Sequence, residues 1–135
     1  MRRVMRLGVA LLFLGMMPSS GWAGNFDGSK PLICAVQETF EWEQGQDCKR
    51  GNAQSIDLPD FFRVHVKEKK ILVSRGGKEE TTKIEHMEKV GEMWFLQGVE
   101  LRGWTLSISE KTGKAVMAVA GEEEGFVVSG ACTPQ

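Results

Sequence analysis

The sequence has no tyrosine, only two histidines and three cysteines in 135 residues. With no H-x-x-x-H or H-E-x-x-H spacing, His65 and His86 are expected to be exposed strand residues, and neither a metal nor another cofactor is predicted. The glycines form no G-x-G-x-x-G or G-K-[ST] phosphate loop, and a G-x-S-x-G elbow for a serine hydrolase is missing. The sequence therefore predicts a protein that is not an enzyme.

The N-terminus has the pattern of a cleaved export signal. Three arginines precede the apolar run Leu7–Met17, whose 11 residues are too few to span a bilayer as a stable helix. Gly21 and Ala23 then place small residues at the −3 and −1 positions of a signal-peptidase site. We expect residues 1–23 to be a cleaved signal peptide and residues 24–135 to form a single domain, located in the periplasm or secreted.

After this signal the chain lacks both a positive charge excess and a long apolar run. The signal contains three of the 17 basic residues, so 14 remain against 18 acidic ones, and the net charge is −4 with neutral histidines. Nucleic acids and anionic membrane surfaces attract basic proteins, so neither is an expected partner. No later apolar run approaches the roughly 18 residues of a membrane span, so no membrane anchor is expected after signal cleavage.

Apolar and polar residues alternate along the remaining chain with the period of two that is typical of half-buried strands. The clearest case, Trp104 to Ser109, leads into Glu110–Gly113, where the late glycine suits a type I turn with a glycine bulge. About eight strands are expected, over residues 31–42, 62–67, 71–73, 81–87, 92–97, 104–109, 114–120 and 126–132. Their short connections predict an all-β antiparallel meander, and we favour a closed barrel over a two-sheet sandwich.

One connection is long, and several aromatic residues lie away from the apolar stripes. The long connection, 43–60, is predicted to hold a short helical turn near 53–58 and to serve as a lid or a binding loop. Phe61 and Phe95 fall on the opposite faces of their strands, and Trp42 lies at a strand end. At the mouth of a barrel these three would bind a ligand or a protein. Burial in a sandwich and ordinary surface exposure are the alternatives.

Three cysteines follow the signal, so one disulfide is expected in an oxidising compartment. Cys34 and Cys132 lie in the first and last strands, which are neighbours in a closed meander. A Cys34–Cys48 bond would instead pin the long connection and stabilise the fold by roughly 3 kcal/mol, and Cys48–Cys132 is a third pairing. If Cys48 is the free thiol, Lys49 and Arg50 favour its thiolate. Thiol redox chemistry is therefore one alternative function.

Three further stretches carry a resemblance to known proteins. They run from Gly103 through Glu110–Gly113 to Glu122, from Gly130 to Pro134, and from Pro31 to Ala35. They resemble a family of small exported proteins of Gram-negative bacteria whose function is uncharacterised. The resemblance implies export and a β-rich domain, without catalytic residues. Members carry another cysteine near position 42, and its lack here implies that Cys48 has lost its partner and that Cys34 pairs with Cys132.

The size and compartment are also similar to those of the small periplasmic lysozyme inhibitors, which are disulfide-stapled β-barrels. Their serine- and glycine-rich inhibitory motif and the tyrosine after it are missing here, so the similarity concerns architecture only. We expect an exported non-enzymatic protein that binds a small ligand or an envelope protein. Inhibition of cell-wall hydrolases and thiol redox chemistry at Cys48 are the alternatives.

Overall fold

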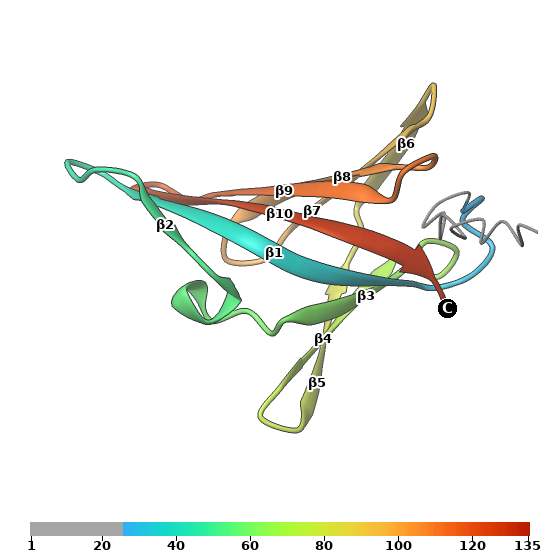
Figure 1. The fold of residues 1–135 in the computed structure, drawn as a ribbon, viewed down its shortest axis with the longest axis horizontal. Helices are drawn as coiled ribbons and strands as arrows, with labels where there is room; N and C mark the ends of the chain where they lie inside the picture. The colour runs from blue at the N-terminus through green and yellow to red at the C-terminus, as the bar shows by residue number, and fades with distance from the viewer. Residues whose placement is uncertain (1–25) are drawn as a thin grey trace, which may run out of the picture.

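The computed structural model describes residues 26–135, which form one strongly curled antiparallel sheet (Figure 1). The predicted signal peptide, residues 1–23, lies outside the described residues. The elements are β1 (Leu32–Glu43), β2 (Lys49–Gly51), the 3-10 helix η1 (Ala53–Ile56), β3 (Phe61–His65), β4 (Lys70–Arg75), β5 (Lys78–Lys83), β6 (His86–Val90), β7 (Met93–Val99), β8 (Gly103–Ser109), β9 (Lys114–Ala120) and β10 (Glu124–Pro134). The all-β antiparallel meander is confirmed, with ten strands in the described part instead of about eight.

The strand order is β5-β4-β3-β1-β10-β9-β8-β7-β6. Consecutive hairpins build β3 to β5 on one side and β6 to β10 on the other. Strand β1 joins the two sides, because it pairs with β3 through residues 32–35 and with β10 along its whole length. The short β2 pairs with the second half of β1. The first and last strands of the domain are therefore neighbours in the middle of the sheet.

The sheet is open, so the expectation of a closed barrel is wrong. Its edge strands, β5 and β6, are consecutive in the chain and are separated only by Ile84 and Glu85. The buried Ile84 donates its amide hydrogen to the carbonyl of Lys69, and Glu85 donates to that of Gln97. Tight hairpin turns require residues such as Gly, Asn or Asp, which are missing here. The chain therefore runs on from β5 into β6, and the two strands diverge (Figure 1).

This corner falls inside residues 81–87, which were expected to form one strand. Two other local predictions agree with the structure. The helical turn near residues 53–58 is η1, and Gly113 has a φ of 71°, as the turn with a glycine bulge requires. Within residues 26–135 no helix has the length and apolar character needed to cross a membrane.

The core lies on the inner, concave face of the sheet. It includes the predicted stripe Trp104, Leu106 and Ile108, all of which are buried. Phe26 precedes β1 and is only 3% exposed, and its ring stacks on that of Trp94 with 6.1 Å between centroids. The segment before the first strand is therefore part of the core.

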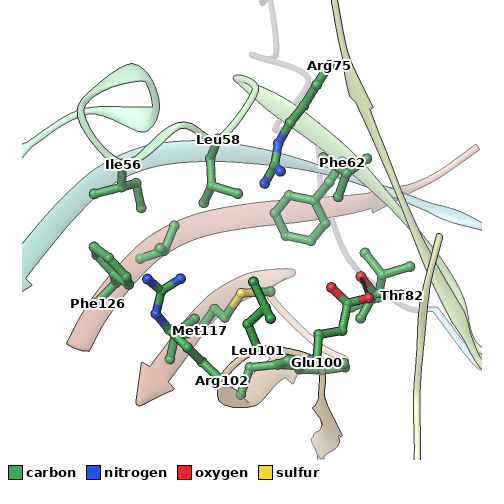
Figure 2. Close-up of a pocket in the computed structure, with 15 residues that line it drawn as sticks. Ile56, Leu58, Phe62, Arg75, Thr82, Glu100, Leu101, Arg102, Met117 and Phe126 are labelled. Atoms are coloured by element: carbon green, nitrogen blue, oxygen red, sulfur yellow. Dashed lines mark hydrogen bonds between the residues drawn. The ribbon is translucent and has the colours of Figure 1, made fainter. Parts of the chain in front are cut away.

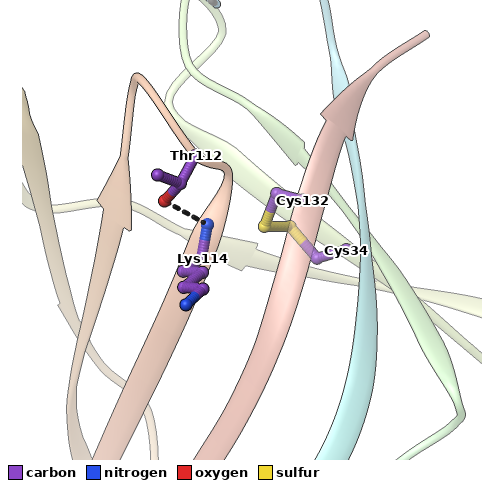
Figure 3. The surroundings of a disulfide bond; sticks show 4 residues. All are labelled: Cys34, Thr112, Lys114 and Cys132. Atoms are coloured by element: carbon purple, nitrogen blue, oxygen red, sulfur yellow. Dashed lines mark hydrogen bonds between the residues drawn. A yellow bond between two sulfur atoms is a disulfide. The ribbon is translucent and has the colours of Figure 1, made fainter. Parts of the chain in front are cut away.

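A disulfide links Cys34 of β1 to Cys132 of β10, which are register partners (Figure 3). Cys48 is exposed and precedes β2, whose Lys49 pairs with Glu41. Glu41 is seven residues along β1 from Cys34, a separation of about 23 Å at roughly 3.3 Å per residue. A disulfide needs Cα atoms within about 7 Å, so Cys48 cannot reach Cys34 in this fold. The bond joins the central strands and does not lie at the opening between β5 and β6.

Candidate functional site

A cavity of about 250 Å³ opens on the inner face of the sheet (Figure 2). Most of its wall is apolar. These residues come from the loop around η1 and from strands on both sides of the curl: Ile56, Leu58, Phe62, Ile71, Val73, Trp104, Met117, Val119, Phe126 and Val128. The buried indole nitrogen of Trp104 has no hydrogen-bond partner among the described residues. The volume lies just below the roughly 300–1,000 Å³ that is typical of sites for drug-sized ligands.

The loop around η1 forms one side of the cavity. Thr39 of β1 is fully buried, and its hydroxyl donates to the carbonyl of Asn52 over 3.0 Å and lies 3.3 Å from the hydroxyl of Ser55. These contacts hold η1 against the sheet, and Ile56 and Leu58 thereby reach the cavity. The long connection expected as a lid or binding loop thus supplies two apolar residues of the wall.

Arg102 lies on the opposite side of the cavity, just before β8. Its guanidinium forms an ion pair with Glu124, in which Nε donates to Oε1 over 2.7 Å. The same group lies 5.4 Å from the centre of the Phe126 ring, a distance typical of a cation–π contact. Arg102 is therefore held at the rim by two residues of β10.

The turn that precedes Arg102 places an exposed leucine at the same rim. Leu101 lines the cavity and is 96% exposed. Its neighbour Glu100 accepts a hydrogen bond of 2.9 Å from the hydroxyl of Thr82 in β5. The turn between β7 and β8 is thus tied to β5, across the opening of the sheet.

A second arginine, Arg75 at the end of β4, also lines the cavity. Its Nη1 donates to Oε2 of Glu80 over 3.1 Å. Figure 2 shows its guanidinium pointing toward Leu58 and Phe62. Among residues 26–135, the wall of the cavity therefore carries two cations, Arg75 and Arg102, and one anion, Glu100.

None of the three aromatic residues predicted to bind a partner lines this cavity. Trp42 is 46% exposed at the end of β1, Phe61 is 58% exposed at the start of β3, and Phe95 is half-buried in β7. All three lie on the outer face, opposite the core, and they do not form one cluster. Phe61 pairs with Ala35, seven residues along β1 from Trp42, and Phe95 lies several strands away. Their role in binding stays a prediction.

The two histidines lie outside the cavity wall. His86 is exposed, as expected. His65 was also expected to be exposed, but its side chain is only 16% exposed, and neither ring nitrogen has a hydrogen-bond partner among the described residues. The β3–β4 turn places Glu68 over this ring, with Oε1 3.5 Å from Nδ1. Within residues 26–135 no three His, Cys, Asp or Glu side chains gather as metal ligands.

Sequence reasoning missed the cavity because its apolar wall has the same alternation as a packed core. Phe62, Val73 and Met117 occupy inner positions of their strands, and a period of two does not reveal whether the inner face is filled. No sequence pattern indicated a binding role for Arg75 or Arg102, because Arg75 lies at a strand end and Arg102 lies in a turn.

Comparison with known proteins adds no assignment: no family model matches the sequence, and no curated protein or solved structure shows significant similarity. Chemically, the cavity can bury a small apolar group and can contact a charged group at its rim.

Proposed function

We propose that this protein is a non-enzymatic binding protein that holds a small apolar ligand in the cavity of its inner face. The observation that carries the proposal is the cavity itself, which has a volume of about 250 Å³ and is lined mainly by apolar residues. Moving apolar ligand surface from water into such a site is favourable by about 25 cal/mol for each Å² that is buried.

We further propose that the protein works in the periplasm or outside the cell. The signal pattern of residues 1–23 supports export, and the Cys34–Cys132 disulfide is consistent with it, because disulfides persist in oxidising compartments.

The test is a fluorescence titration with 1-naphthylamine, an uncharged ten-carbon aromatic probe whose emission shifts to shorter wavelength in apolar surroundings. We expect saturable binding of about one probe per protein. Val119→Phe should abolish it, because Val119 lines the cavity. Val116→Phe is the matched control, since Val116 lies three residues earlier in β9 on the outer face and is exposed.

Both variants must keep a cooperative thermal transition for this comparison to count as a binding effect. Probe binding that is lost in Val119→Phe and kept in Val116→Phe supports the cavity. Absence of saturable binding to the wild-type protein, or equal binding by the two folded variants, contradicts the proposal.

Inhibition of cell-wall hydrolases and redox chemistry at the exposed Cys48 stay alternative predictions. Inhibition predicts slower lysis of cell walls by lysozyme at near-stoichiometric protein. Redox chemistry predicts rapid alkylation of Cys48 in the native protein and loss of activity in Cys48→Ser.

A further inference from the structure

We infer that the ligand is a single-chain amphiphile with an anionic head group, of the chemical class of a medium-chain fatty acid, and that Arg75 and Arg102 hold its carboxylate at the rim. This inference rests on the proposed binding function and specifies the ligand of the same cavity.

The size of the cavity sets the length of the apolar part. A group the size of a water molecule takes up roughly 30 Å³ in a liquid, so 250 Å³ accommodates about eight methylene or methyl groups. A single chain of about eight to ten carbons fits this space with its polar end at the rim. A long-chain or two-chain lipid does not fit inside it.

The two arginines supply the hydrogen-bond donors that recognise an anion. Arg75 and Arg102 both line the cavity, and Figure 2 shows them on opposite sides of it. A guanidinium has five N–H donors in a planar fork that suits a carboxylate. Among the described residues Arg75 donates only through Nη1, to Glu80, and Arg102 only through Nε and Nη2, to Glu124. Donors of both groups therefore remain for a ligand.

Each of the two arginines is paired with a carboxylate, so the preference for an anion depends on the N–H donors that remain and not on net charge. Glu80 and Glu124 pair with the arginines from positions outside the cavity wall. Glu100 is the one carboxylate in the wall, and it accepts the hydrogen bond from Thr82. A carboxylate accepts strong hydrogen bonds from the remaining donors, a hydroxyl accepts weaker ones and a cationic head group accepts none. This order favours an anionic head group over a neutral one and a neutral one over a cation.

The experiment displaces bound 1-naphthylamine with three ligands that share an eight-carbon chain. Octanoate, 1-octanol and octyltrimethylammonium are titrated below their micelle concentrations near neutral pH. We expect octanoate to bind about tenfold more tightly than octanol, the size of effect that one hydrogen bond to a charged group produces. Octyltrimethylammonium should bind most weakly.

Variants of the two arginines test whether the preference for octanoate over octanol comes from the rim of the cavity. Arg75→Gln and Arg102→Gln should each weaken octanoate binding about fivefold to tenfold and octanol binding by much less. Arg63→Gln is the control, because Arg63 lies 4.0 Å from Glu79 in a similar exposed ion pair between β3 and β5 but does not line the cavity. Chains longer than about ten carbons should add no further affinity.

Two results would overturn the inference and leave the proposed function intact: equal affinity of the wild-type protein for octanoate and octanol, or an equal loss of octanoate binding in Arg63→Gln and the two rim variants. If the neutral probe itself does not bind, the proposed function fails as well, so the two failures can be told apart.

Discussion

The indole ring of Trp104 lies directly over Gly98, its register partner across β7 and β8. A Cβ atom on Gly98 would lie 2.6 Å from Cε2 of the indole and 2.7 Å from the carbonyl oxygen of Lys83. Because Gly98 has no side chain, the carbonyl of Lys83 at the end of β5 and the indole of Trp104 in the cavity wall can both approach β7 at this position, beside the cavity.

Gly98→Ala should lower the free energy of unfolding by about 1–3 kcal/mol, the usual cost of overpacking a filled site. The indole of Trp104 must also move, so binding of the neutral probe should weaken. Urea unfolding followed by tryptophan fluorescence measures the first effect. Gly103→Ala is the control, because nothing lies within 4 Å of its added Cβ. Equal unfolding midpoints for the two variants would contradict this account.

Phe26→Ala should lower the free energy of unfolding by about 3–5 kcal/mol, as expected for truncation of a buried phenylalanine. Phe26 is 3% exposed and stacks on Trp94, although it comes before the first strand. Phe61→Ala offers a matched control at a site that is 58% exposed, and it should change stability by less than about 1 kcal/mol. Similar denaturation curves for both variants would show that the segment before β1 is not part of the core.

Replacement of both Cys34 and Cys132 by serine should cost about 2–5 kcal/mol of stability. The bond closes a sequence separation of 98 residues, which corresponds to about 4.7 kcal/mol in the chain-entropy model. Equilibrium unfolding with and without reductant measures the effect. Cys48→Ser should leave the transition unchanged, because this side chain is exposed. Reductant should destabilise the wild-type protein and leave the double variant unaffected.

The pH dependence of stability should show the contribution of the ionised Glu110 carboxylate. A hydrogen bond from the Lys89 ammonium, and next one from the Trp94 indole N–H, lower the pKa of the Glu110 carboxyl below its usual 4.5. A pKa that is lower in the folded state means that the stabilisation is fully present above pH 4.5. It is lost as the pH falls through the folded value.

Glu110→Gln should therefore melt at a lower temperature than the wild-type protein at neutral pH, and the difference should shrink on acidification below about pH 4.5. Glu122→Gln removes one negative charge at an exposed position and serves as the control. Melting curves recorded from pH 7 to pH 3 provide the measurement. A difference in melting temperature between Glu110→Gln and wild type that stays constant over this range would argue against the ionic contact between Glu110 and Lys89.

Leu101→Ser should weaken ligand binding about fivefold and leave the melting temperature unchanged. The side chain is 96% exposed, so it contributes almost nothing to the core, but it lies on the cavity wall, where a bound chain can cover it. Titration with the neutral probe and a thermal scan separate the two effects. A lower melting temperature in this variant would instead assign Leu101 a structural role.

Local patterns were sufficient for much of the fold. The alternation of Trp104, Leu106 and Ile108 predicts an inner face that the structure confirms as buried, and Gly113 marks its turn correctly. Such features depend on residues that are close in sequence, where the period of the side chains and the φ angle of a turn are decided. The site was harder to predict, since Arg75 and Arg102 are 27 positions apart and belong to different sides of the curl.

By itself the sequence determined the β class, the meander of hairpins, the helical turn in the long connection and an inner stripe of apolar residues, because each follows from neighbouring residues. Only the tertiary structure decided that the sheet stays open at Ile84 and that its curl leaves a cavity on the inner face, so that the candidate site is not at Trp42, Phe61 and Phe95. These depend on how strands distant in the chain pack against one another. An alternating pattern specifies which side of a strand is apolar, but it does not specify what that side meets.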